Sequence, residues 1–230
     1  MGFRPTSGSA TAPSPTTTGA CSLPGSALPA LHSAPMSTEE QQRWDERYAT
    51  GGYRPRTEPS PFVVSATARI PRGRALVLAC GTGRNALYLA GAGFEVEAVD
   101  ISAVAIAQAE SEAERRGLEV KFRVADLDKE ALPTGAYDLV TMVRYVKRDL
   151  WPRVVEALTG DGWLLTEQHL KTHREVIGPT GAFRVEPGEM LRAFSDLRIV
   201  EYWEGVETGD RDGEEAVLAR LLACKGEPGW

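Results

Sequence analysis

Short apolar runs alternate with helix-forming segments along the central part of the chain. The segments between the runs carry helix signals, such as Ser102 before and Gly117 after the segment Ala103–Arg116. Strands that alternate with helices predict right-handed βαβ units and a parallel sheet. The predicted strands are Ala75–Ala79, Glu95–Val99, Val120–Val124, Tyr137–Val143 and Trp163–Gln168, and the predicted helices are Arg84–Ala92, Ala103–Arg116 and Leu150–Leu158.

The C-terminal part has a different pattern, because its two apolar runs have no helix between them. Arg198–Glu204 and Glu215–Cys224 are joined by the turn-forming segment Gly209–Gly213, and a short helix at Glu189–Phe194 precedes them. The two runs are therefore predicted to pair as an antiparallel hairpin. The whole pattern predicts an α/β fold with a doubly wound, mostly parallel seven-stranded sheet that ends in a C-terminal antiparallel hairpin.

The first 35 residues differ in composition from the rest of the chain. They are mostly Ser, Thr, Pro, Ala and Gly, and Arg4 is their only charged residue. Such a segment cannot bury enough apolar surface to offset its ordering entropy, so we predict a disordered tail over 1–35 and one folded domain over 36–230. Met36 is an alternative start, because Ser37 and the acidic residues after it are typical of a first helical turn.

Composition and charge exclude several classes of protein. The chain is 42% hydrophobic and 25% charged, as globular proteins are, and it has no apolar run of about 18 residues that would predict a membrane span. Its formal net charge of −6 argues against general binding to nucleic acid. Cys21, Cys80 and Cys224 form neither a metal-binding pair nor a disulfide framework, so we expect a cytoplasmic protein.

A glycine-containing loop follows the first predicted strand and precedes a helix. Its sequence, Gly81-Thr82-Gly83-Arg84-Asn85-Ala86, has the pattern G-x-G-x-x-A. The glycines of such a loop let the backbone approach a ligand closely. The order of strand, loop and helix is typical of sites for nucleotide-containing cofactors.

Two carboxylates follow the next two predicted strands. Asp100 comes directly after Glu95–Val99, and Asp126 follows Val120–Val124 closely. A carboxylate at the end of the second strand can accept hydrogen bonds from both hydroxyls of a ribose, and it can also cap the helix that follows. Asp126 can hold an adenine amino group beside Leu127, although an ordinary loop residue is the simpler interpretation of Asp126 alone.

In order and spacing, these motifs resemble those of the class I S-adenosylmethionine-dependent methyltransferases, whose Rossmann-like fold also ends in an antiparallel strand pair. Trp44 and Tyr48, in the segment Trp44-Asp45-Glu46-Arg47-Tyr48, resemble the small-molecule branch that includes tellurite-resistance and thiopurine-type methyltransferases. This resemblance implies an N-terminal helix that covers the pocket. The matching blocks are Leu78–Leu87, Ala98–Ser102, Val124–Leu127 and Tyr137–Val140, within about residues 75–168.

The resemblance implies a role for each matched position, with S-adenosyl-L-methionine as the cofactor. Gly81 and Gly83 would lie close to its methionine part. Asp100 would bind the ribose, and Asp126 and Leu127 would bind the adenine. The predicted cofactor-binding residues are Ala79, Cys80, Gly81, Gly83, Asn85, Asp100, Ile101, Asp126, Leu127 and Met142.

The methyl acceptor is predicted to bind at the carboxyl ends of the fourth and fifth strands, where ligands of such sheets bind. The basic residues in Gln168–Arg174 indicate either an anion-binding, base-supplying rim or a solvated loop. His169 and His173 are four residues apart with no third ligand evident, so we predict no metal site. The predicted catalytic residues are Arg144, Tyr145, Lys147 and His169, and the predicted substrate or lid residues are Trp44, Tyr48, Lys171 and His173.

Two positions depart from the family pattern. Family members commonly carry an acidic residue where this chain has Val77, and that residue helps to order the amino-acid end of the cofactor. A Val77→Asp change is therefore expected to tighten cofactor binding if the family role holds. Lys147 stands where this branch has His, which puts acid–base chemistry at this position in doubt.

The sequence therefore predicts S-adenosylmethionine-dependent methyl transfer to a small molecule, with thiol, selenol, oxyanion, carboxylate and hydroxyl acceptors all open. The alternative is a cofactor-binding pseudoenzyme or sensor, because of Val77 and Lys147. An NAD-dependent oxidoreductase is less favoured, because Asp126 and the hairpin favour a methyltransferase. We expect no nucleic-acid partner, because the motifs of DNA methyltransferases are absent after the fourth strand and the chain is acidic, and no membrane partner, because no apolar run is long enough to span one. The sequence does not indicate an oligomeric state.

Overall fold

The structure is a computed structural model that describes residues 1–2, 38–52, 56–176, 178–179, 181–208 and 215–229. Apart from residues 1 and 2, the predicted tail and the alternative start at Met36 lie outside the described residues. Within these ranges, every helix is too short or too polar to cross a membrane.

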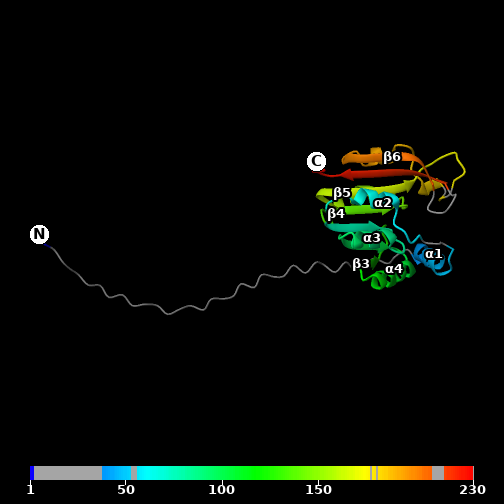
Figure 1. Ribbon diagram of the computed structural model, residues 1–230, viewed down its shortest axis with the longest axis horizontal. Coiled ribbons are helices and arrows are strands. Elements are labelled where there is room, and N and C mark those ends of the chain that lie inside the picture. The colour runs from blue at the N-terminus through cyan, green and yellow to red at the C-terminus, as the bar shows by residue number, and fades with distance from the viewer. Residues whose placement is uncertain (3–37, 53–55, 177, 180, 209–214, 230) are drawn as a thin grey trace. The chain divides into compact units, whose positions relative to one another are not determined.

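In the described part of the chain, seven strands form one sheet in the order β3-β2-β1-β4-β5-β7-β6 (Figure 1). The first five strands in this order are parallel, whereas β7 runs antiparallel to both β5 and β6. The predicted fold class is therefore confirmed. The strand order reverses at β1, and ligands bind at the carboxyl ends beside such a switch point. The strands are β1 Arg74–Leu78, β2 Glu95–Asp100, β3 Val120–Val124, β4 Tyr137–Val143, β5 Leu158–His169, β6 Arg198–Thr208 and β7 Glu215–Cys224.

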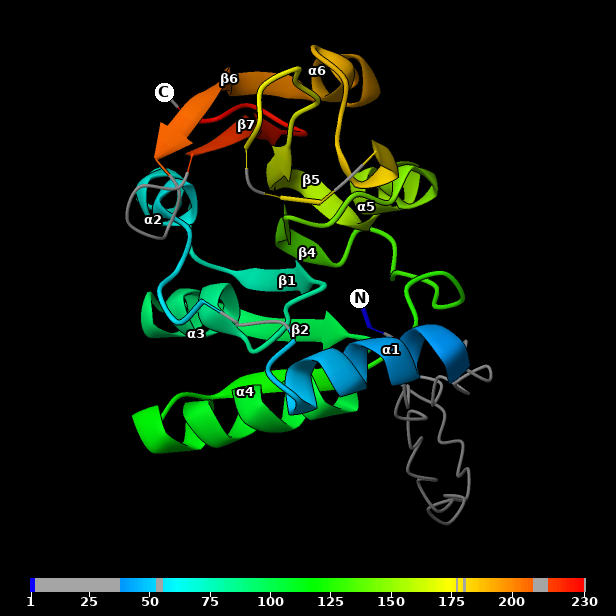
Figure 2. The same ribbon diagram turned by 90° about the vertical axis from the view of Figure 1, so that its right-hand side faces the viewer.

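Helices cover both faces of this sheet (Figure 2). One apolar cluster joins α2 and α3 to the sheet, and Phe62, Val77 and Leu89 are among its buried members. A second cluster on the opposite face includes Trp151 of α5 and Met190 of α6. The helices are α1 Thr38–Ala49, α2 Pro61–Thr67, α3 Arg84–Gly91, α4 Ala103–Arg116, α5 Trp151–Ala157 and α6 Glu189–Ala193, with short 3₁₀ turns η1 Arg148–Leu150 and η2 Gly181–Phe183.

Helix α4 has the bounds that its capping residues predict. The hydroxyl of Ser102 accepts a hydrogen bond from the backbone N–H of Ala105 at 3.1 Å, as an N-cap does. Gly117 ends the helix with φ of 64°, in the left-handed region that glycine adopts without a steric cost. Local sequence signals therefore set both ends of α4, the helix that follows β2 and Asp100.

Three other elements differ from the prediction. Helix α2 was not predicted, because its β-branched residues Val63 and Val64 do not indicate a helix on their own. Strand β5 begins at Leu158, before the glycines of Gly160–Gly162 that interrupt the apolar pattern. Strand β6 continues past Glu204 to Thr208, because its pairing with β7 extends along the whole hairpin.

Candidate cofactor and acceptor site

The glycine loop is a tight turn between β1 and α3 in which several residues have positive φ angles. Ala79, Gly81 and Gly83 have φ of 49°, 54° and 81°. A Cβ on Gly81 would lie 2.8 Å from the hydroxyl oxygen of Tyr48, whereas one on Gly83 would lie 3.0 Å from the Cβ of Ala109. Gly81 therefore faces the predicted pocket beneath α1, and Gly83 is required by packing as well as by its backbone angle.

Asp100 ties this loop to the end of β2. One carboxylate oxygen accepts a hydrogen bond from the Gly81 N–H at 2.7 Å, and the other accepts one from the Ser102 N–H at 2.9 Å. The side chain is buried, and this burial raises the pKa of Asp100 above its ordinary value. The Ile101 N–H also interacts with this carboxylate, and a carboxylate has about four acceptor sites, so three backbone donors leave room for a further donor such as a ribose hydroxyl.

The predicted adenine-binding pair lies after β3. Asp126 is buried, and it accepts a hydrogen bond from the Asp128 N–H at 3.0 Å and pairs with Lys129 at 3.3 Å. Leu127 is also buried, and its carbonyl accepts a hydrogen bond from Arg153 at 3.2 Å. Both residues follow the strand next to β2, so the topology brings them to the same edge of the sheet as Asp100.

The other predicted cofactor-binding residues have mixed surroundings. The side-chain oxygen of Asn85 accepts a hydrogen bond from the Ser60 N–H at 2.9 Å, so Asn85 anchors the start of α2. Met142 is fully buried in the apolar core, whereas Ile101 is half-buried. Burial and the charge of Asp100 raise the pKa of the Cys80 thiol well above its ordinary value.

Helix α1 lies beside the carboxyl ends of β1 and β2 (Figure 2). The rings of Trp44 and Tyr48 form a tilted contact with centroids 6.0 Å apart, and the Tyr48 hydroxyl lies beside Gly81. Asp45 fixes the helix, because its carboxylate accepts hydrogen bonds from the Ser102 hydroxyl at 2.6 Å and the Val104 N–H at 3.1 Å. Ser102 is therefore held by Asp45 on one side and by Asp100 on the other.

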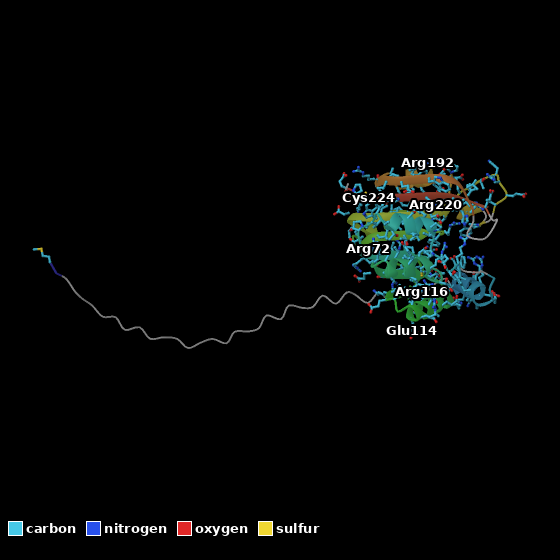
Figure 3. All side chains as sticks on the ribbon, in the orientation of Figure 1. Arg72, Glu114, Arg116, Arg192, Arg220 and Cys224 are labelled. Carbon is cyan, nitrogen blue, oxygen red and sulfur yellow. The ribbon has the colours of Figure 1, made fainter. Side chains whose placement is uncertain are left out.

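A buried ionic network lies at the carboxyl ends of β4 and β5. Arg144, with φ of 61°, donates from Nε to Glu167 at 3.0 Å. Arg220 on β7, which is labelled in Figure 3, donates to the other Glu167 oxygen at 2.8 Å. The Ser60 hydroxyl also donates to Glu167, at 3.2 Å. Although burial favours the neutral acid, the two guanidinium groups lower the pKa of Glu167 overall, so it is a carboxylate. We refer to Glu167, Arg144, Arg220 and Ser60 as the Glu167 network.

His169 is the last residue of β5 and lies beside this network. Its Nε2 is 2.9 Å from Arg144 Nη1, and the ring is buried. Burial lowers the pKa of His169 to about 3, and the nearby positive charge of Arg144 adds to this effect. At neutral pH the imidazole is therefore uncharged, and its low basicity makes it a poor general base.

The remaining predicted residues lie nearer the surface. Lys147 forms an ion pair with Asp128 at 2.7 Å. Tyr145 is half-buried, and burial followed by the charge of Asp128 raises its pKa. Lys171 pairs with Glu186, and His173 is exposed, so the loop after β5 does not gather its basic side chains into one site.

Sequence reasoning missed several residues of this region. The sequence patterns gave no role to Asp45 or Glu167, although each makes two or more buried or half-buried polar contacts. Arg56 and Arg184 were also missed, and both lower the pKa of His169. No sequence signal indicates that Arg56 and Arg184 lie near His169, because both residues come from segments outside the strands and helices that only the fold brings close to it. Within the described ranges, no three His, Cys, Asp or Glu side chains are placed to hold a metal ion.

Comparison with known proteins gives the family of the central segment. Residues 75–160 match the family model described as a methyltransferase domain, and no curated protein matches the chain in sequence. TehB from Haemophilus influenzae is 23% identical, with 79% of this chain and 67% of TehB covered and a TM-score of 0.65.

Two further solved structures share the fold at a similarly low sequence identity. Coclaurine N-methyltransferase bound to N-methylheliamine and SAH is 19% identical, with 71% of each chain covered and a TM-score of 0.57. The [4+2]-cyclase SpnF is 18% identical, with 85% of this chain and 98% of SpnF covered and a TM-score of 0.63. The match of residues 75–160 to a methyltransferase domain, within a fold that these structures share, agrees with the resemblance drawn from the sequence.

Proposed function

We propose that this protein transfers the methyl group of S-adenosylmethionine to a small-molecule acceptor. The observation that carries the proposal is the buried Asp100 at the end of β2, held against the Gly81 loop inside the segment that matches a methyltransferase domain. Such a carboxylate beside a close-approach glycine suits a nucleoside-containing ligand. The missing Cβ at Gly81 and the remaining acceptor capacity of Asp100 fit this cofactor.

The chain's own residues would bind and align the two reactants. When bound, S-adenosylmethionine supplies a methyl group that is activated by the positive charge on sulfur. Asp100 would accept hydrogen bonds from its ribose, and Asp126 would accept one from its adenine. Tyr48 and the rest of α1 would exclude water above Gly81. Methyl transfer depends on alignment more than on proton transfer, so the low basicity of His169 does not weigh against it.

The acceptor would bind between the ends of β4 and β5. Arg144 and His169 lie there together, 2.9 Å apart, and the Glu167 network fixes the position of Arg144. Soft acceptors such as thiols suit this arrangement, because they need only be deprotonated and His169 is not a strong base. The cytoplasmic location and the absence of membrane and nucleic-acid partners stay predictions.

The cofactor assignment is tested by calorimetric titration of the full-length protein with S-adenosylhomocysteine, and with NAD as the competing candidate. We expect binding of S-adenosylhomocysteine alone. Asp100→Ala should weaken it by about 1–3 kcal/mol, because ribose hydroxyls lose a buried acceptor. Asp196→Ala, at an exposed carboxylate, is the matched control and should bind as the wild type does. Unchanged affinity in the D100A protein would refute the assignment.

A second candidate function is cofactor binding without methyl transfer. Two observations favour it: Val77 is apolar where the family commonly has an acid, and the cyclase SpnF has the same fold. Incubation with labelled S-adenosylmethionine and a panel of thiols, carboxylates and hydroxyl compounds separates the two functions. Methylated product from any acceptor supports the enzyme, whereas tight binding with no product supports the pseudoenzyme or sensor.

A further inference from the structure

Arg144 is held in a strained backbone conformation directly after β4. Its φ of 61° lies in the left-handed region, which residues other than glycine rarely adopt. Glu167 on the neighbouring strand β5 holds this conformation twice, because its carbonyl accepts from the Arg144 N–H at 2.7 Å and its carboxylate accepts from Arg144 Nε at 3.0 Å. Strained residues persist only where their surroundings fix them, and they gather at functional sites.

The hydroxyl of Ser60 strengthens this hold on Arg144 and forgoes a more common role. Ser60 precedes α2 at the N-cap position, where serine usually accepts a hydrogen bond from the first turn, but it accepts none there. It donates instead to the Glu167 oxygen that binds Arg144, at 3.2 Å. Both Ser60 and Glu167 are buried. The position of Arg144 is therefore fixed by two buried side chains from other parts of the chain.

Part of the Arg144 guanidinium group is left without a protein partner. A guanidinium has five N–H donors. Within the described ranges, Arg144 uses Nε for Glu167 and Nη1 for His169, and its Nη2 has no partner. The side chain is 15% exposed, and Nη2 is not among the buried polar atoms that lack a partner, so this nitrogen is accessible to a ligand.

The positive charge of Arg144 is only partly balanced by its contacts. Glu167 is shared with Arg220, which also pairs with a second carboxylate, that of Glu207, at 2.8 Å. His169 adds no negative charge, since its low pKa leaves the imidazole neutral. Arg144 therefore combines unused donors with positive charge that its neighbours do not cancel, and this combination favours an anion.

Arg144 lies at the edge of the sheet where ligands of such folds bind. Strands β4 and β1 pair so that Met142 stands beside Leu78. Arg144 follows two residues after Met142, just as Cys80 at the start of the glycine loop follows two residues after Leu78. This loop is the predicted place of the methionine part of the cofactor, and the predicted acceptor lies on the other side, toward β5. An anion at Arg144 would therefore belong to one of the two reactants.

We propose that the unused edge of the Arg144 guanidinium group binds a carboxylate of a reactant, with Glu167 and Ser60 as the positioning residues. A carboxylate suits this group because its two oxygens match the planar pair of donors that arginine offers. The inference rests on the proposed function, which supplies two sources: the methyl acceptor and the amino-acid end of the cofactor. An acceptor thiol that carries a carboxylate fits both the proposed reaction and this site.

Nuclear magnetic resonance of the full-length protein tests this site with acetate, a minimal carboxylate, and with acetamide as its neutral isostere. The imidazole nitrogens of His169 are the reporter, because Nε2 contacts Arg144. At constant ionic strength, we expect acetate to shift the His169 resonances, whereas acetamide and chloride should not. Arg144→Gln should abolish the acetate response, while Arg192→Gln, at an exposed arginine of α6, should retain it.

The same titrations distinguish the two sources of the carboxylate. If the acceptor supplies it, acetate should still act on the protein saturated with S-adenosylhomocysteine, and Arg144→Gln should leave the affinity for S-adenosylhomocysteine unchanged. If the cofactor supplies it, saturation should abolish the acetate response, and R144Q should lower that affinity about tenfold or more. Its affinity for 5′-methylthioadenosine, which has no amino-acid end, should then stay unchanged. Either pattern supports the site and identifies its ligand.

Three results overturn the proposal. They are the lack of an acetate response in the free protein, an equal response to acetamide, and an undiminished acetate response in R144Q. Failure of the proposed function has a different signature. A protein that does not bind S-adenosylhomocysteine, but still responds to acetate through Arg144, would refute the cofactor assignment and retain the anion site.

Ser60 provides a second test that leaves Arg144 in place. Ser60→Ala removes the hydroxyl from Glu167 and should lower the affinity for acetate about threefold, because Arg144 is held less firmly. Ser65→Ala makes the same change at an exposed position of α2 and should leave this affinity as in the wild type. Equal affinity for acetate in S60A and S65A would show that Ser60 does not position Arg144.

Discussion

Val77 lies within the apolar cluster between the sheet and helices α2 and α3, and only 3% of its surface is exposed. A carboxylate at this position would be buried among apolar side chains, where an unpaired charge is costly. The family pattern alone led to the expectation that an acid here would tighten cofactor binding. The structure adds a stability cost to that expectation.

We therefore expect Val77→Asp to lower the free energy of unfolding by about 2–4 kcal/mol, because a polar group is buried without a partner. Urea denaturation measures this effect. Val64→Asp makes the same change at a position of α2 that is 39% exposed, and it should cost much less. If V77D is as stable as V64D and binds S-adenosylhomocysteine more tightly, the family role of the acid holds here.

At the residue scale, the sequence indicated the residues whose roles depend on local motifs. Asp100 and Gly81 lie together as their spacing predicts, because both follow neighbouring parallel strands. Glu167 and Arg220 could not be predicted as partners, because they come from strands paired in a register that no motif encodes. Arg144 adopts a left-handed φ although it is not glycine, and its sequence gives no sign of this.

At the scale of elements, the N-terminal helix depends on one side chain for its position. Asp45 accepts two hydrogen bonds at the start of α4, from the Ser102 hydroxyl and the Val104 N–H. These bonds place Tyr48 over Gly81. A loss of the Asp45 charge should therefore loosen α1 without unfolding the sheet.

We expect Asp45→Asn to speed amide hydrogen exchange in α1 about five- to tenfold, because charge-assisted hydrogen bonds are replaced by weaker ones. Hydrogen-exchange mass spectrometry resolves α1 from the rest of the chain. Glu46→Gln makes the same kind of change at the next, exposed residue and should leave exchange unchanged. Equal exchange in both variants would show that α1 is held by its apolar contacts instead.

The elements themselves were predictable where the signals are local. The bounds of α4, β3, β4 and β7 agree with the prediction, because caps and apolar runs mark them. Helix α2 was missed, since only Pro61 at its first turn marks a helix start within a run rich in valine. The interruption of β5 by glycines hid its first residues, which pair with β4 across a bulge.

At the scale of the whole molecule, the buried His169 couples stability to pH. Its pKa is about 3 in the folded protein and near 6.5 in an unfolded chain. As pH falls through 6.5, the unfolded chain takes up a proton that the folded protein does not, so stability decreases. Glu167 has a lowered pKa, so its stabilising contribution is present above about 4.5 and is lost only at lower pH.

Between pH 7 and pH 5, the change in stability therefore reports on the protonation of His169 and not on that of Glu167. We expect the wild type to lose up to about 2 kcal/mol more stability across this interval than His169→Asn, which has no imidazole to protonate. Urea denaturation at both pH values measures the difference. His173→Asn removes an exposed imidazole and should retain the pH dependence of the wild type. Parallel behaviour of the wild type and H169N would mean that the His169 ring protonates in the folded protein, and hence that burial and the nearby guanidinium groups do not hold it neutral.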